Sequence, residues 1–369
     1  MQIICVGDLC CDLVVPYGRM RQALREGAVS KETADSLLIR MQCGGSVGNV
    51  ARHLGRLGSR PVFLTPLKRD ELGTFLAGEM EKAGADMRWA APSERSNMYC
   101  IAVLDEGGER TMFSFVPPWA DYPRFDEKSF LNVPHAEESI LFTSGMAILD
   151  DPGNNAAVLD FFRKRRAEGA RIVFDLNVRA ESYGYEGERR RAMEEMIALS
   201  DIVLGSGPEE FGQVTGQTDL REAARILLGR MPGGISGHRA VIARDGGHPI
   251  LVLEAGRPEA QNPEAPETSA SGTRNPEAPE TSASGTMTSE TPAPETMSLE
   301  GPASGTTNPE APASREFCVE VKPVKPVSTL GAGDCFDAMF LFALAKGEGI
   351  GQAVRAASDH AGDYISGRI

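Results

Sequence analysis

Several residue patterns that usually reveal an enzyme's chemistry are missing from this sequence. It shows no serine, histidine and aspartate arrangement for nucleophilic catalysis, and its seven cysteines form no CxxC pair and no metal-spaced cluster with histidine. An odd number of cysteines spread through apolar segments predicts reduced, buried thiols in a cytoplasmic protein. No apolar run is long enough to span a bilayer, so we expect no membrane partner.

The sequence also has fewer basic than acidic residues. Lys and Arg number 38 against 52 Asp and Glu, which leaves a formal net charge of −14 at pH 7. This balance argues against nucleic acids and anionic membrane surfaces as partners, although a local site can still be electropositive and bind a small anion. The first residues, "MQIICVGDLCCDLVV", carry no basic segment and meet Asp8 and Asp12 early, so we expect a strand there and not a signal peptide.

Aromatic residues are absent from one long segment, residues 255–315, in which Pro, Glu, Ser, Thr, Ala and Gly dominate. It repeats "NPEAPETSASGT" at 262–273 and 275–286, with a partial copy at 308–312. Such a tract cannot bury enough apolar surface to offset its ordering entropy, which predicts a disordered insert. Because both flanks predict strands, we expect an expanded hairpin loop inside a single domain of residues 1–369. A docking tail for a partner is the alternative.

The rest of the chain alternates predicted strands with helices of 10–17 residues. This pattern predicts βαβ units and a mostly parallel sheet covered on both faces. Ligands bind beyond the carboxyl ends of such strands, which is where Asp175, Gly205 and Gly207 fall. Residues 99–116 predict an antiparallel hairpin outside the main sheet. Residues 17–42 read as helix, with a capping signal at Ser30.

The stretch most informative about a catalytic role is "STLGAGDCFDAMF" (328–340), where glycines precede an acid and an apolar helix. Gly331, Ala332 and Gly333 would let backbone N–H groups converge on an anion at the helix start. Asp334 could then accept a proton from an attacking hydroxyl. Alternatively the glycines form a simple turn and Asp334 is a helix N-cap. These four residues alone do not decide between the two interpretations.

A second stretch, "CGGSVGNVARHLGRLG" (43–58), places two glycines before a helix that carries Asn49. Gly44 and Gly45 permit close backbone approach to a ligand, and the Asn49 amide offers both a donor and an acceptor to sugar-like hydroxyls. Since any helix can begin after Gly-Gly, this stretch is weak evidence by itself.

Together, and in this order, the two stretches resemble the signatures of the ribokinase-like (PfkB) carbohydrate kinases, "GG…N.A..L..LG" and "DT.GAGD.F.AGF". "GARIVFDLNVR" (169–179) and "SGPEEFGQVTG" (206–216) are similar to segments that lie between them in the family. Residues 105–121 look like the lid region of fructokinase and ketodeoxygluconate kinase members. The resemblance implies a ribokinase-like three-layer α/β/α sandwich with a mostly parallel central sheet. It also implies a small β lid from parts of 13–42 and 97–118.

The resemblance further implies ATP-dependent phosphorylation of a hydroxyl on a small sugar or sugar acid, fructose-like or ketodeoxygluconate-like. Asp334 would be the general base, and the amides of Gly331, Ala332 and Gly333 would stabilise the transferring phosphoryl group. The residues expected to bind the acceptor are Asp12, Gly44, Gly45, Asn49, Asn177 and Arg179. Glu210, Thr329, Gly331 and Gly333 would bind the nucleotide, with Mg²⁺ held by Glu210 through water. A homodimer and a monovalent cation near the anion-binding turn are left open.

The sequence departs from the family pattern at three positions. Ser328 replaces an acid, Gly207 replaces an asparagine and Lys68 replaces a glycine. None of these changes removes the base or the glycine turn, so an active kinase is the expected outcome. A weakly active or non-catalytic sugar-binding relative is one alternative, and a nucleoside kinase of the same family is another. Arg179 has a simpler interpretation as a surface salt-bridge residue.

Overall fold

The computed structural model describes residues 1–27, 34–106, 110–115, 123–133, 138–231, 238–256, 314–327 and 329–369. Three features raised by the sequence fall outside these ranges: the insert from residue 257 to residue 313, the capping signal at Ser30, and Ser328.

The central sheet has eight strands in the order β14-β13-β12-β11-β10-β9-β1-β4. All neighbours from β4 to β12 run parallel, whereas β13 and β14 are antiparallel to their neighbours. The predicted, mostly parallel sheet is therefore confirmed. Its strands are β1 (Gln2–Val6), β4 (Val62–Leu64), β9 (Ser139–Ser144), β10 (Arg171–Asp175), β11 (Ile202–Ser206), β12 (Arg239–Arg244), β13 (Ile250–Ala255) and β14 (Ser314–Val319).

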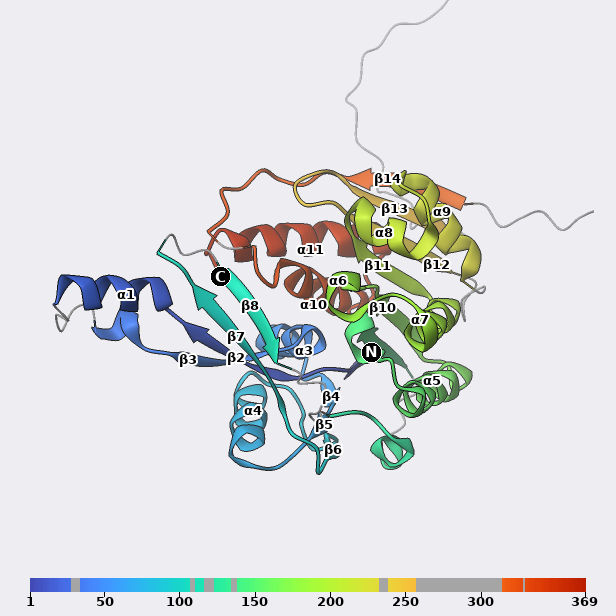
Figure 1. Ribbon diagram of the computed structural model, residues 1–369. Coiled ribbons are helices and arrows are strands. Elements are labelled where there is room, and N and C mark those ends of the chain that lie inside the picture. The colour runs from blue at the N-terminus through green and yellow to red at the C-terminus, as the bar shows by residue number, and fades with distance from the viewer. Residues whose placement is uncertain are drawn as a thin grey trace, which may run out of the picture. The chain divides into compact units, whose positions relative to one another are not determined.

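Helices cover both faces of this sheet, as side-chain alternation along the strands requires (Figure 1). In β1, Ile3 and Cys5 enter one core, and Ile4 and Val6 enter the other. The first core is completed by α3 (Ser46–Arg56), α4 (Glu71–Lys82), α10 (Ala332–Ala345) and α11 (Ile350–Ile365). The second is completed by α5 (Pro152–Ala167), α7 (Gly187–Leu199), α8 (Gly207–Thr215) and α9 (Leu220–Arg230). This is the expected three-layer α/β/α arrangement.

A separate four-stranded sheet, with the order β3-β2-β7-β8, forms the lid. Its strands are β2 (Cys10–Val15), β3 (Arg40–Gly44), β7 (Met98–Leu104) and β8 (Arg110–Phe115), and the antiparallel β7–β8 hairpin is confirmed. The helix predicted over 17–42 is wrong at its end. Helix α1 covers Tyr17–Glu26, residues 28–33 lie outside the described ranges, and Arg40–Gly44 pairs antiparallel with β2. Backbone pairing with a neighbouring strand outweighs the local helix propensity there.

The first predicted strand is also two strands rather than one. It breaks between Val6 and Cys10, so that β1 belongs to the central sheet and β2 to the lid. Asp8 explains the break, because its carboxylate accepts hydrogen bonds from the backbone N–H groups of Ser46 (2.7 Å) and Val47 (3.1 Å) at the start of α3. The chain leaves one sheet, caps a helix with Asp8, and enters the other sheet.

The strands that flank the low-complexity insert pair with each other. β13 and β14 are antiparallel, with Ala255 opposite Ser314, so the chain leaves and re-enters the sheet at adjacent positions. The remaining short elements are α6 (Ala180–Tyr183), the paired β5 (Pro66–Leu67) and β6 (Ala91–Pro92), and 3-10 turns at Asp35–Leu37, Glu127–Phe130 and Gly145–Ala147.

All seven cysteines lie in the described residues and are free thiols. The prediction that they are buried holds for five of them but is wrong for Cys318, which is exposed on β14, while Cys100 is half-buried. Among the helices of the described residues, none has the length and apolar character that a membrane crossing needs.

Candidate active site

The start of α10 is the point where the two glycine-containing stretches meet. Gly331 is the N-cap of this helix, with a left-handed backbone (φ 74°), and Asp334 lies in the first turn. One oxygen of the Asp334 carboxylate accepts a hydrogen bond from Ser46 Oγ (3.0 Å) and the other accepts one from Asn49 Nδ2 (2.9 Å). Helices α3 and α10 pack on the same face of the sheet, which brings together residues 285 positions apart in the sequence.

Asp334 is therefore not the simple helix cap that the four-residue motif left open. Burial raises its pKa to about 6, although the hydrogen bonds from Asn49 and Ser46 act in the opposite direction. The negative charges of Asp175 and Asp8 raise the pKa further. A carboxylate whose pKa lies close to neutral can accept a proton and still be largely ionised at pH 7, which is the requirement for a general base.

The turn before Asp334 offers backbone donors at a helix N-terminus. The first α-helical hydrogen bond of α10 runs from Cys335 N–H to Gly331 O (2.9 Å). The N–H groups before Cys335 therefore have no partner of the α-helical type within the helix. The Ala332 N–H already donates to Thr329 O (3.2 Å). Of the three amides predicted to bind an anion, that of Ala332 therefore already has an acceptor within the turn.

Gly44 and Gly45 are required by two carboxylates of the protein itself. A Cβ on Gly44 would lie 2.5 Å from the carboxylate oxygens of Asp12, and one on Gly45 would lie 2.8 Å from the backbone oxygen of Asp8. Gly45 also has a positive φ of 90°, which disfavours any larger residue. The glycines thus allow Asp8 and Asp12 to approach the chain just before α3.

The orientation of the Asn49 amide is determined by Arg52, one turn later on α3. Arg52 Nη2 donates to Asn49 Oδ1 (2.9 Å), and Arg52 Nη1 donates to Cys43 O (2.8 Å). Because arginine can only donate, the Asn49 oxygen must face Arg52, which turns the amide NH₂ toward Asp334. Asn49, predicted to bind the acceptor, is thus engaged with Asp334 in this structure.

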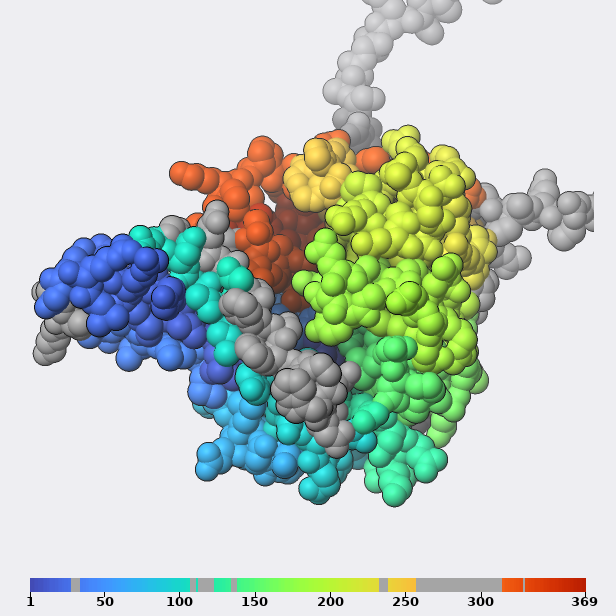
Figure 2. Space-filling view, viewed as in Figure 1, coloured from blue at the N-terminus to red at the C-terminus, as the bar shows by residue number. Residues whose placement is uncertain are grey.

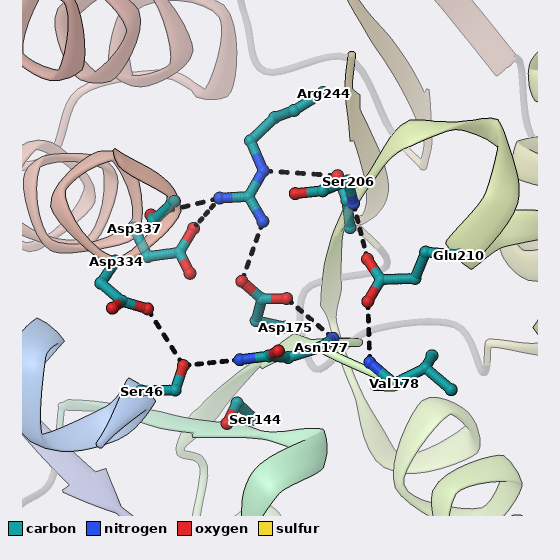
Figure 3. A network of polar contacts seen from close by, with 12 residues as sticks. Ser46, Ser144, Asp175, Asn177, Val178, Ser206, Glu210, Arg244, Asp334 and Asp337 are labelled. Atoms are coloured by element: carbon teal, nitrogen blue, oxygen red, sulfur yellow. Dashed lines mark hydrogen bonds and ion pairs between the residues drawn. The ribbon is translucent and has the colours of Figure 1, made fainter. Parts of the chain in front are cut away.

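The segment after β10 contributes a second line of hydrogen bonds to the same centre. Asn177 Nδ2 donates to Ser46 Oγ (2.7 Å), and Arg179 Nε donates to Asn177 Oδ1 (2.8 Å). Both Asn177 (φ 33°) and Arg179 (φ 47°) have left-handed backbones, a costly conformation that is concentrated at functional sites. Figure 3 shows Ser46 between Asn177 and Asp334. The hydrogen bond to Asn177 is a more specific role for Arg179 than a surface salt bridge.

A buried arginine lies beside the Asp334 turn (Figure 3). Arg244, at the end of β12, donates through Nη2 to Asp175 (2.8 Å) and through Nη1 to Asp337 (2.7 Å) and Gly333 O (3.2 Å). Its Nε donates to Gly205 O at 3.3 Å. Arg244 therefore joins the carboxyl ends of three strands to the first turn of α10.

The pKa values of the two acids beside Arg244 are shifted in opposite directions. Burial would raise the pKa of Asp175, but Arg244 holds it below its ordinary value. The pKa of Asp337 is instead raised well above its ordinary value by burial, and the charge of Asp175 raises it further. Oδ2 of Asp337 is buried and has no hydrogen-bond partner among the described residues. Arg244 thus lies between two buried acids, one with a lowered pKa and one with a raised pKa.

Glu210 lies on α8 at the other side of the β10 end. Its two oxygens accept hydrogen bonds from the backbone N–H groups of Val178 (2.7 Å) and Ser206 (2.6 Å). Burial and the nearby charge of Asp175 raise its pKa to about 7. Because both oxygens already have a protein donor, Glu210 would reach a ligand or a metal through water.

These side chains surround a pocket of about 640 Å³ at the carboxyl ends of the strands. Figure 2 shows the corresponding hollow between the green and orange-red surfaces. Of the predicted site residues, the pocket is lined by Asn177, Arg179, Glu210, Thr329, Gly331, Ala332, Gly333 and Asp334. Asp12, Gly44, Gly45 and Asn49 are not among its described lining residues; Asn49 reaches Asp334 from the lid side.

Three residues at the centre of this network were not predicted. Ser46 follows Gly-Gly at the first position of α3, where a hydroxyl commonly faces a helix end. Arg244 is a lone cation at the end of the apolar run "AVIAR", and Asp337 interrupts the apolar helix "CFDAMFLFALA". A charged residue inside an apolar run is the signal that could have identified the last two, because buried charges need partners.

The comparison with protein families identifies this arrangement. The model described as pfkB family carbohydrate kinase matches residues 2–271 and 312–363. The chain belongs to the pfkB family of carbohydrate kinases. The resemblance found in the two motifs is therefore confirmed.

Individual relatives are distant. The chain is 25% identical to the 5-dehydro-2-deoxygluconokinase of Clostridium tetani over 57% of its own length and 62% of the relative's. It is 27% identical to the fructokinase of Klebsiella pneumoniae over 49% of its own length and 58% of the relative's. The aligned regions thus span about three fifths of these pfkB-type relatives.

Solved structures confirm the fold. An aminoimidazole riboside kinase from Salmonella enterica, complexed with aminoimidazole riboside and an ATP analog, matches with a TM-score of 0.65 at 18% identity, covering 99% of this chain and 94% of the other. A fructokinase from Vibrio cholerae, with fructose, ADP and a calcium ion bound, matches with a TM-score of 0.66 at 18% identity, covering 99% and 92%.

Proposed function

We propose that this pfkB-family protein transfers the terminal phosphoryl group of ATP to a hydroxyl of a small sugar or sugar acid, with Asp334 as the general base. The observation that carries the proposal is the Asp334 carboxylate, placed at a helix N-terminus on the rim of a pocket and given a pKa of about 6. Ser46 and Asn49 aim its two oxygens, so the base is held in one orientation.

Asp334 would accept the proton of the acceptor hydroxyl as the oxygen attacks phosphorus. The phosphoryl group would lie against the amides of the turn before and at the start of α10, those of Gly331, Gly333 and Asp334, where the helix dipole and the N–H groups stabilise negative charge. Phosphoryl transfer requires mainly positioning and electrostatic stabilisation, and these are the properties that this turn supplies.

The rim of the pocket suits Mg²⁺ and a nucleotide. Its oxygen donors include the carboxylates of Asp175 and Glu210, and hard oxygen ligands are those that Mg²⁺ prefers. Because the oxygens of Glu210 accept backbone hydrogen bonds, Glu210 would hold the ion through water. When bound, Mg²⁺ would neutralise charge on the phosphates. Thr329 and the exposed Val327 and Leu330 would flank the nucleotide.

The acceptor would bind between the pocket and the lid, where Asp12, Gly44 and Gly45 lie. Asn49 and Asn177 border this region through Asp334 and Ser46. The fructokinase and 5-dehydro-2-deoxygluconokinase relatives support a fructose-like or keto-sugar-acid acceptor. The exposed Arg179 would suit the anionic end of a sugar acid or the phosphates.

A matched pair of variants on α10 tests the proposal. Asp334→Asn should lower kcat by about 10²–10⁴-fold, the usual contribution of a general base. Asp337→Asn is the same chemical change three positions later, beyond the pocket, and should keep kcat within about tenfold of the unchanged protein, since only indirect effects remain. The measurement is coupled-assay turnover with Mg-ATP and a panel of D-fructose, 2-keto-3-deoxygluconate and nucleosides.

The same panel, measured by thermal shift with and without Mg-ATP, separates an enzyme from a binding relative. For an enzyme, both an acceptor and Mg-ATP should raise the melting temperature. A protein that a sugar stabilises but Mg-ATP does not, and that transfers no phosphate, is a sugar-binding relative, and the proposal is then wrong. Equal turnover in Asp334→Asn and the unchanged protein would remove Asp334 as the base.

A further inference from the structure

The lid strand β2 carries a second group of chemically active side chains, separate from the pocket at α10. Cys10 and Asp12 lie two positions apart on β2, so their side chains project from the same face of the lid sheet. The neighbouring strand β7 runs parallel, with Cys100 directly paired with Asp12. The lid sheet therefore places two thiols and one carboxylate side by side.

The ligand atoms of these three residues lie within 4.8 Å of one another. Cys10 Sγ is 3.5 Å from Asp12 Oδ1, a separation that also serves a thiol–carboxylate hydrogen bond. A tetrahedral zinc ion, with bonds of about 2.3 Å to sulfur and about 2.0 Å to oxygen, separates such a pair of ligands by roughly 3.5 Å. The geometry of this pair already matches that of two ligands on one metal ion.

The other face of the same strand shows what distinguishes this group. Cys11 is paired with Cys43 across β2 and β3, and both side chains are buried in the first hydrophobic core. Among the described residues, Cys10, Asp12 and Cys100 are the group of three whose possible ligand atoms all lie within 4.8 Å of one another, and Asp12, only partly buried, keeps the group accessible.

We propose that Cys10, Asp12 and Cys100 form a three-ligand site for Zn²⁺, with water in the fourth position. Thiolates select zinc over Mg²⁺, so this site and the oxygen-rich pocket would take different cations. Binding displaces the two thiol protons to solvent and draws the three side chains together. Zinc at Asp12 would also withdraw this carboxylate from the acceptor, making Zn²⁺ a competitor of the sugar; this second part rests on the proposed function.

Cobalt absorption tests the site without any assay of activity. Co²⁺ titrated into the full chain under argon, with a non-thiol reductant, should produce a sulfur-to-cobalt charge-transfer band at one equivalent, which Zn²⁺ then abolishes. Cys10→Ser and Cys100→Ser should each weaken Co²⁺ binding by at least about 100-fold, because loss of even an outer-shell partner costs 10–100-fold. Asp12→Asn, which keeps the shape of the side chain, should weaken binding without removing the band.

Two cysteine variants serve as controls. Cys318→Ser changes an exposed thiol on β14, and Cys11→Ala changes the adjacent residue on the opposite face of β2. Both should titrate like the unchanged chain. The site is refuted if no charge-transfer band forms, or if the band survives in both Cys10→Ser and Cys100→Ser. Far-ultraviolet circular dichroism of each variant establishes that it is folded.

Competition with the acceptor is measured separately. With D-fructose or 2-keto-3-deoxygluconate as the acceptor, Zn²⁺ should raise the acceptor KM in the unchanged protein and in Cys318→Ser, but not in Cys100→Ser. A cobalt band accompanied by an unchanged KM would refute the competition and keep the metal site. If no acceptor is phosphorylated, the proposed function fails while the cobalt titration still decides the metal site.

Discussion

Asp334 and Asp337 are the same residue type, three positions apart on one helix, and the structure gives them opposite surroundings. Asp334 faces the pocket and receives hydrogen bonds from the neutral donors Ser46 and Asn49. Asp337 is fully buried and faces the guanidinium of Arg244 and the carboxylate of Asp175. Burial raises the pKa of both. Access and partners, rather than a perturbed pKa, therefore separate a candidate base from a structural acid.

The comparison also separates two ways of satisfying a buried carboxyl group. Neutral donors orient Asp334 without cancelling its charge, so the group can still exchange a proton with a ligand. Asp337 shares its surroundings with the Arg244–Asp175 ion pair, and burial raises its pKa well above the ordinary value. The first arrangement suits chemistry, and the second holds the ends of three strands to α10.

The largest expected effect comes from removing the cation of the buried group. Arg244→Leu leaves the Asp175 charge uncompensated, and losing one partner of a buried pair costs about 3–5 kcal/mol in the free energy of unfolding. Arg88→Leu is the control, because Arg88 pairs with Asp86 at the surface, where such a pair contributes little to stability. The measurement is urea unfolding of both variants. Equal losses would show that Arg244 is not a central structural link.

The pH dependence of Asp334 is the next effect in size. Its folded pKa of about 6 lies above the ordinary value of 3.8, so the folded protein favours the protonated form. Ionisation therefore lowers stability as pH rises from about 4 to about 6, by at most roughly 3 kcal/mol. The stability of Asp334→Asn relative to the unchanged protein should grow over this interval, measured by chemical unfolding at pH 4 and pH 7.

Activity, unlike stability, should rise with pH over the same interval. Because only the ionised carboxylate can accept a proton, kcat/KM should rise with pH through an apparent pKa near 6. A rise centred near 4, together with a pH-independent difference in stability, would mean that Asp334 is solvated like a surface acid.

The smallest effect is expected at Asp337 itself. Since burial raises the pKa of Asp337 well above its ordinary value, Asp337→Asn should change the free energy of unfolding by less than about 1 kcal/mol, as an uncharged amide can accept from Arg244 and donate to Asp175. Asp175→Asn should cost about 1.5–3 kcal/mol more, because it removes the anion that pairs with Arg244. Thermal and urea unfolding of the two variants compare them directly. A larger loss of stability in Asp337→Asn than in Asp175→Asn would mean that Asp337, rather than Asp175, carries the negative charge that pairs with Arg244.

Local patterns were sufficient for much of the fold. Strands such as Arg171–Asp175 and helices such as Pro152–Ala167 follow from short apolar runs and helical periodicity, and the parallel sheet follows from their alternation. The errors lie in two segments. Residues 2–15 divide into one strand of the central sheet and one strand of the lid sheet, and Arg40–Gly44 forms a strand that pairs with β2 in the lid sheet. Which sheet a strand joins depends on partners distant in the sequence, and local propensity contains no information about them.

The residues of the candidate site also fall into those that local patterns could identify and those that they could not. The glycine turns and Asp334 could be recognised because tight turns and anion binding demand particular residues in short stretches. Ser46, Arg244 and Asp337 could not be placed, because the hydrogen-bond partners of their side chains lie 39 to 288 positions away. The predicted role of Asn49 also changed once Arg52 was seen to turn its amide toward Asp334.

The sequence by itself determined the family of this protein, its layered α/β architecture and the helix that carries Asp334. Only the tertiary structure decided which of the two aspartates on that helix faces the pocket and which is held by Arg244. The physical reason is that ionisation, access and hydrogen bonding depend on what surrounds a side chain. Those surroundings are assembled from segments that only the folded chain brings together.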